Sequence, residues 1–143
     1  MSKLATVPKH LWIIGIITLL WNLMGAYDYL MTQTHNEAYM AGFDQAQLDY
    51  FYGFPTWVEV FWALAVWGGV LGSVLLLLRK CLALPVFVVS FVSMAITAVY
   101  NFGLSSGMEV MGAQGLAFTV VIFLVALGLV IYSWLMRKQG VID

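Results

Sequence analysis

Four long apolar stretches dominate the chain, and polar and charged residues gather between them. The stretches cover about residues 9–31, 56–79, 82–104 and 113–136. Each reaches the length of about 20 residues that an α-helix needs to cross a bilayer core. Residues 32–55, between the first two, form a connection longer than a simple turn requires. The pattern predicts an all-α integral membrane four-helix bundle, built as one membrane domain over residues 1–143.

Composition supports a membrane location. Hydrophobic residues make up 63% of the chain and charged residues 9%, with a mean hydropathy of +0.94, whereas soluble proteins carry roughly a quarter charged residues. The lipid bilayer is therefore the first expected partner. Lys3 and Lys9 precede the first apolar stretch, as basic residues do in a signal peptide, but no small-x-small cleavage pattern follows. We expect an uncleaved first helix.

The basic residues fall on one side of the predicted bundle. They lie before the first helix, between the second and third, and after the fourth: Lys3, Lys9, Arg79, Lys80, Arg137 and Lys138. The other side carries the acidic residues Glu37, Asp44, Asp49 and Glu109 and no lysine or arginine. The positive-inside rule then predicts that both termini are cytoplasmic. No basic stripe suited to nucleic acid is present.

The outer loop, residues 32–55, is rich in aromatic residues and carries helix-start signals. Thr34-x-x-Glu37 and Asp44-x-x-Gln47 resemble capping boxes and predict two short interfacial helices, and Thr56-x-x-Glu59 and Ser106-x-x-Glu109 predict caps for the second and fourth long helices. The apolar and aromatic loop residues are Tyr39, Phe43, Leu48, Tyr50, Phe51, Tyr52 and Phe54. They suit either a belt at the membrane surface or a lid over a ligand.

Small residues on the second helix predict a close helix contact. Gly68, Gly69, Gly72 and Ser73 form overlapping small-xxx-small pairs, which let another helix approach closely. That helix belongs either to the same chain or to a partner in a homo-oligomer or larger membrane complex.

Polar residues inside the membrane predict a second contact. Asn22 lies nine residues before the outer end of the first stretch, about 13 Å deep at 1.5 Å per residue. At the same depth on the third helix lie Ser93 and Thr97, in a stripe with Ser90 and Asn101. We expect the first and third helices to hydrogen-bond to each other through these residues.

Nearer the outer side, polar residues of three helices lie about one turn from the helix ends. Asn22, Asp28, Tyr29, Glu59, Tyr100 and Asn101 form the candidate ligand-binding set. Two carboxylates with amide and phenol groups suit a cation, an amine or a polyol. An alternative is that Glu59 caps its own helix and Asp28 stays hydrated at the interface. A further alternative is a close carboxylate pair with one raised pKa, which would suit proton coupling.

Catalytic and metal chemistry has little support in the sequence. His10 and His35 flank opposite ends of the first helix, and Cys81 has no second cysteine. No metal-ligand spacing, nucleophile triad, phosphate loop or dinucleotide motif occurs. We expect a protein without catalytic activity, cofactor or metal.

Several motifs resemble a known group of proteins. Trp21-Asn22-Leu23-Met24-Gly25-Ala26-Tyr27-Asp28-Tyr29 resembles small uncharacterised four-helix inner-membrane proteins of proteobacteria, some of them automatically labelled sugar transporters, as do Phe54-Pro55-x-Trp57 and Tyr100-x-Phe102-Gly103. The resemblance implies a multi-pass protein of the bacterial inner membrane that moves a small polar solute.

Two functions of different classes follow. The first is binding or transport of a small polar solute from the periplasmic side. The second is a non-catalytic accessory or scaffold subunit of a larger membrane complex. Proteoliposome assays with Asp28→Asn and Glu59→Gln test the first, and co-purification tests the second.

Overall fold

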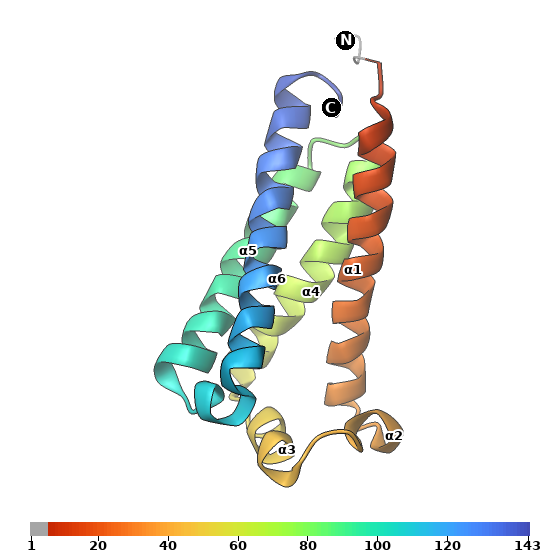
Figure 1. The fold of residues 1–143 in the computed structure, drawn as a ribbon. Coiled ribbons are helices and arrows are strands. Elements are labelled where there is room, and N and C mark those ends of the chain that lie inside the picture. Colours follow the sequence, from red (N-terminus) through yellow and green to blue (C-terminus); the bar gives the residue numbers. More distant parts are fainter. Residues whose placement is uncertain (1–5) are drawn as a thin grey trace.

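The computed structural model describes residues 6–143, so Lys3 lies outside the described part. The described chain is helical, without strands (Figure 1). Its elements are α1 (Lys9–Gln33), α2 (Glu37–Met40), α3 (Gln45–Tyr52), α4 (Thr56–Leu77), α5 (Ala83–Val99), the π-helix η1 (Tyr100–Leu104) and α6 (Gly107–Lys138). Four spans are long and apolar enough to cross a membrane: α1, α4, α5 with η1, and α6. The predicted all-helical fold with four helices of membrane-spanning length is confirmed.

The helix boundaries follow the sequence pattern closely except in α6. This helix begins at Gly107, six residues before the expected start at 113, but Gly112 interrupts it with non-helical angles of φ 69° and ψ −168°. A positive φ of this kind costs glycine little and other residues much more. The uninterrupted part of α6 therefore begins where the apolar pattern predicts it.

One of the four predicted caps is confirmed. The Asp44 carboxylate accepts a hydrogen bond from Gln47 N at 2.8 Å, and the Gln47 side chain accepts one from Asp44 N at 3.1 Å, which completes a capping box on α3. The box predicted at Thr34 is wrong, because the Thr34 hydroxyl donates to Leu30 O at the end of α1 and Asn36 caps α2 instead.

The caps predicted for α4 and α6 are also wrong. Pro55, with φ −59°, occupies the N-cap of α4, so Thr56 is already the first helical residue. Ser106, at φ −85° and ψ 22°, lacks the extended backbone that an N-cap side chain normally needs. Neither helix start has a side-chain cap hydrogen bond.

Helix α4 lies at the centre of the packing, with α1 on one side and α5 on the other, and α6 packs on α5. The prediction that Asn22 hydrogen-bonds the first long helix, α1, to the third, α5, is wrong. Asn22 Nδ2 instead donates to Gly69 O at 3.1 Å and to Ser73 Oγ at 3.0 Å, both on α4. Because Gly69 has no side chain, α1 approaches α4 closely. The Asn22 amide is therefore hydrogen-bonded to α4 rather than to α5.

Two glycines of α4, Gly69 and Gly72, are covered from within the chain. A Cβ at Gly69 would lie 2.5 Å from Asn22 Oδ1, and one at Gly72 would lie 2.6 Å from two ring carbons of Phe87. On the α5 side, Ser90 Oγ donates to Ala65 O at 2.6 Å. Gly69, Gly72 and Ser73 therefore make the internal contact, while Gly68 lines a groove on the outside of α4 and α5.

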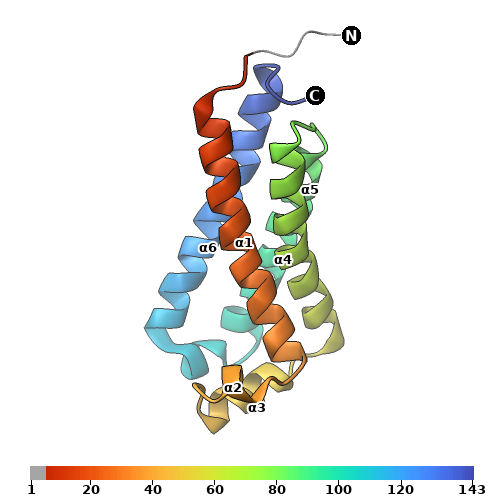
Figure 2. The same ribbon diagram turned by 90° about the vertical axis from the view of Figure 1, so that its right-hand side faces the viewer.

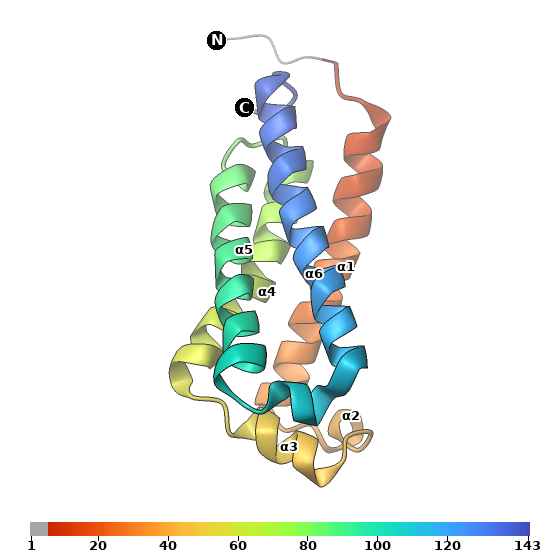
Figure 3. The same ribbon diagram turned by 60° about the vertical axis from the view of Figure 1, so that its left-hand side comes forward.

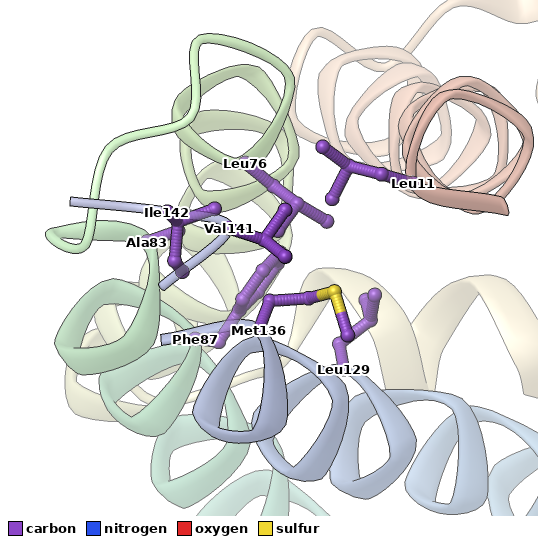
Figure 4. Close-up of a cluster of buried hydrophobic side chains, with 8 residues drawn as sticks. All are labelled: Leu11, Leu76, Ala83, Phe87, Leu129, Met136, Val141 and Ile142. Carbon is purple, nitrogen blue, oxygen red and sulfur yellow. The ribbon is translucent and has the colours of Figure 1, made fainter. Parts of the chain in front are cut away.

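The main buried core lies at the end of the bundle where α1 begins and α6 ends, here called the terminal end (Figure 4). Leu11, Leu76, Phe87, Leu129 and Met136 meet there with Ala83 and with Val141 and Ile142 of the C-terminal segment. This segment folds back, because Arg79 Nε donates to Val141 O and Asp143 N donates to Arg79 O, both at 3.0 Å. The terminal end is therefore closed by packed side chains.

Helices α1 and α6 are close at the terminal end and separate toward the opposite end, here called the loop end (Figure 2). Near the terminal end, His10 Nδ1 lies 2.6 Å from the Tyr132 hydroxyl, a hydrogen bond between the two helices. At the loop end, α2 and α3 lie across the ends of the long helices (Figure 3). The bundle is thus tight at one end and spread at the other.

Candidate functional site

A cavity of about 520 Å³ lies between the four long helices, beneath α2 and α3. Ligand sites in proteins commonly have volumes of about 300–1,000 Å³ and mostly apolar walls with a few polar groups. Aromatic and methionine side chains make up much of this wall: Trp21, Met24, Tyr39, Phe43, Phe51, Phe54, Trp62, Phe87, Met94, Met111 and Phe118. The cavity therefore has the size and the character of a small-molecule site.

The cavity has few polar groups and one carboxylate. Asn22, Thr32, Ser90, Thr97, Asn101 and Thr119 line it, and Asp28 is the charged residue in its wall. The described lysines and arginines lie near the terminal end, away from Asp28: Lys9, Arg79, Lys80, Arg137 and Lys138. The fixed charge at the wall is therefore negative, which favours cationic over anionic ligands.

Asp28 lies five residues before the end of α1, about 7.5 Å along the helix. Its Oδ1 accepts a hydrogen bond of 2.5 Å from the hydroxyl of Tyr39 on α2. Burial, together with this bond to Asp28, raises the pKa of Tyr39 well above its usual range. The phenol therefore stays protonated and remains the donor, so the carboxylate is fixed from the loop side.

Helices α2 and α3 form a roof over the cavity at the loop end. Tyr39, Phe43, Phe51 and Phe54 line the cavity from this side, and rings along the roof contact one another edge-on or tilted at centroid distances of 5.4 to 6.3 Å. Of the two alternatives for the aromatic loop, this position over a cavity supports a lid.

Tyr50 fastens α3 to the long helices. Its hydroxyl donates to Asn101 Oδ1 at 2.7 Å and lies 2.7 Å from Ser105 Oγ. Burial raises the pKa of Tyr50, which keeps the phenol protonated. Asn101 lies in the π-helix η1, a local departure from α-helix that is frequent at functional sites. The roof is thus anchored at α1 through Tyr39 and at η1 through Tyr50.

The cavity is closed toward the terminal end and open at its side. Phe87 and Leu129 belong both to its wall and to the buried core, so side chains close this end. Met24 of α1 and Phe118 of α6 line the cavity yet are 68% and 58% exposed. The opening therefore lies between α1 and α6, and the Trp21 and Phe118 rings, with centroids 6.0 Å apart, contact each other across it.

The structure divides the predicted site residues. Asn22, Asp28 and Asn101 line the cavity. Tyr29 and Glu59 instead line a separate groove of about 670 Å³ formed largely by α4 and α5. Tyr100 lines neither and packs against Trp57 and Phe54. Asp28 and Glu59 therefore line different cavities. A single ligand shell or a close carboxylate pair would require both carboxylates in the same cavity.

The sequence reasoning missed the apolar part of the wall. Gly115, Thr119, Ile122 and Ala126 line the cavity from α6. Their spacing of four, three and four residues places them on one helix face, and three of them are small. Small residues on an otherwise bulky apolar helix were the available signal for a hollow there.

Comparisons with protein families, with curated proteins and with solved structures find no match to this chain. Within residues 6–143, no group of three or more His, Cys, Asp or Glu side chains is placed to hold a metal ion. The site is therefore defined by its own geometry: an apolar cavity with one carboxylate, a roof formed by α2 and α3, and a side opening.

Proposed function

We propose that this protein is a multi-pass protein of the bacterial inner membrane that binds a small solute in the cavity between its four long helices, and moves it. Both termini face the cytoplasm and the lid formed by α2 and α3 lies at the periplasmic surface. The charge distribution supports this orientation. Basic residues of the described chain gather at the terminal end, and the loop end carries Glu37, Asp44, Asp49 and Glu109.

The cavity itself carries the proposal. A membrane bundle that only had to be stable would fill its centre, because a cavity forfeits packing contacts. This chain leaves about 520 Å³ open beneath an anchored lid and places Asp28 at its edge. Carboxylates within membrane helices are costly and commonly mark a ligand or ion path. The Nδ2 group of Asn101 adds a donor for orienting a bound solute, whereas the amide hydrogens of Asn22 are donated to Gly69 O and Ser73 Oγ.

Filling the cavity tests this function. In Ala126→Phe a ring is added to the cavity wall of α6, and in the control Ala117→Phe the same ring is added to an exposed position of the same helix that does not line the cavity. Purified protein is screened by thermal unfolding against amines, polyols, sugars and apolar compounds. We expect a compound that stabilises the parent and Ala117→Phe but not Ala126→Phe. The proposal fails if every stabilising compound acts equally on both variants.

A second candidate function is that of an accessory subunit, supported by the groove on α4 and α5. Val60, Leu64, Trp67, Leu71 and Val89 line it and are exposed. Glu59 and Gly68 lie in the same groove, and a neighbouring membrane helix would cover this surface. Isolation in mild detergent at native expression tests this candidate. A lone monomer would contradict it, and a defined complex lost in Trp67→Ala would support it.

A further inference from the structure

We propose that the cavity ligand is a lipophilic monocation, an amine or quaternary centre on an apolar body, that reaches the cavity from the bilayer between α1 and α6. This inference rests on the proposed binding function and names its ligand class. It follows from where the cavity is open, what surrounds it, and which charge it carries.

The route follows from three boundaries of the cavity. The lid closes the loop end, where the hydroxyl of Tyr39 donates a hydrogen bond to Asp28 and that of Tyr50 donates one to Asn101. The core closes the terminal end, where Phe87 and Leu129 form the floor. Met24 and Phe118 leave the side between α1 and α6 exposed. In a membrane this side faces lipid, so a ligand using it must first dissolve in the bilayer.

The wall selects an apolar body. Trp21, Trp62, Phe87 and Phe118 present aromatic surface, and Asn22 already spends its amide hydrogens on Gly69 and Ser73. Thr97 and Thr119 likewise donate to carbonyl oxygens of their own helices. The interior therefore offers a sugar or polyol few free donors, and most hydroxyls of such a ligand would lose water without replacement.

The charge selects a cation. Asp28 receives one hydrogen bond on Oδ1 from Tyr39, and no basic residue lines the cavity in the described chain. A cationic centre would meet both this carboxylate and nearby aromatic faces, which attract cations through their quadrupoles. An anion of the same shape would meet a fixed negative charge in a low-dielectric region.

Three tetrahedral aromatic probes of similar size test the inference: tetraphenylphosphonium, neutral tetraphenylsilane and anionic tetraphenylborate. Binding to the detergent-solubilised full chain is measured by equilibrium dialysis against protein-free detergent. We expect affinity in the order cation, neutral compound, anion. We expect Asp28→Asn to weaken cation binding about tenfold or more and to change neutral binding less than about twofold. Asp28→Glu should keep most of the cation preference.

Two control variants separate this inference from the proposed function. Glu59→Gln changes a carboxylate in the other groove and should leave all three affinities unchanged. Ala126→Phe should weaken the cation and the neutral compound alike. Equal binding of the cation and the anion, or an unchanged cation affinity in folded Asp28→Asn, overturns the ligand class while the cavity function stands. Neutral and cation binding that are both insensitive to Ala126→Phe overturn the cavity function as well.

Discussion

The contact between Gly72 and Phe87 allows a quantitative prediction about packing. Phe87 is 2% exposed, and a Cβ at Gly72 would lie 2.6 Å from two of its ring carbons and 3.1 Å from a third. Carbon atoms in contact normally lie about 3.5–4.0 Å apart, so the ring must move by about 1 Å. Overpacking of this kind costs about 1–3 kcal/mol. Gly72→Ala should therefore weaken the packing of α4 on α5.

A matched control removes the effect of helix propensity. Replacing a helical glycine by alanine favours the helix by about 0.8–1.0 kcal/mol in any position. Gly128, in α6, has nothing within 4 Å of its added Cβ, so Gly128→Ala gains this term without a clash. Unfolding by SDS in mixed micelles should place Gly72→Ala about 1–3 kcal/mol below Gly128→Ala in stability.

The reasoning is refuted if the two alanine variants differ by less than about 0.5 kcal/mol. A double-mutant cycle with Phe87→Leu gives a second check, because the smaller side chain relieves the contact. Gly72→Ala should then cost less in the Phe87→Leu background than in the parent. Additive effects of the two substitutions would contradict the proposed clash.

Further predictions concern three residues: Asn22, Tyr39 and Val141. Asn22→Ala removes two hydrogen bonds from α1 to α4 and should lower stability in SDS unfolding by about 0.6–1.7 kcal/mol. The loss is modest because the Ser73 hydroxyl still donates to Gly69 O. An unchanged stability would contradict the observed pairing. Tyr39→Phe should speed amide exchange in α2, whereas Tyr27→Phe, which removes no hydrogen bond seen here, should not. The pKa of Tyr39 is raised in the folded protein, so the hydrogen bond of Tyr39 to Asp28 contributes its full stabilisation below about pH 10 and loses it above that pH. The stabilities of the parent and Tyr39→Phe should therefore converge as the pH rises further. Val141→Asp buries a carboxylate at the terminal end and should lower stability by about 2 kcal/mol or more, while Asp143→Ala, at an exposed position, should not.

The long helices were predictable because apolar length is a local property. Each span needs about 20 apolar residues, and that requirement can be counted directly. Caps were less predictable, because several polar side chains compete for the same backbone groups: Thr34 resembles a cap residue, yet its hydroxyl bonds backward to Leu30 O. Only Asp44, with no such competing bond, behaves as its motif predicts.

The site was only partly predictable, because depth along a helix does not give direction around the bundle. Asp28 and Glu59 lie at similar distances from their helix ends, but they face the cavity and the outer groove respectively. Asn22 pairs with α4 rather than α5 because Gly69 allows the closer approach. The hollow itself arises from small residues on several helices, and their convergence is a property of tertiary packing.

The most direct test of the central claim is to map where a lipophilic cation binds in a membrane. A photoreactive aryl-azide derivative of triphenylphosphonium is incorporated with the protein in lipid vesicles, activated by light, and located by peptide mass spectrometry. The side-opening cavity predicts labelling of the Trp21–Asp28 and Gly115–Ala126 segments, suppressed by excess tetraphenylphosphonium and by Ala126→Phe. Labelling spread over exposed α4 and α5 positions such as Leu71 and Val89, without competition, would contradict it.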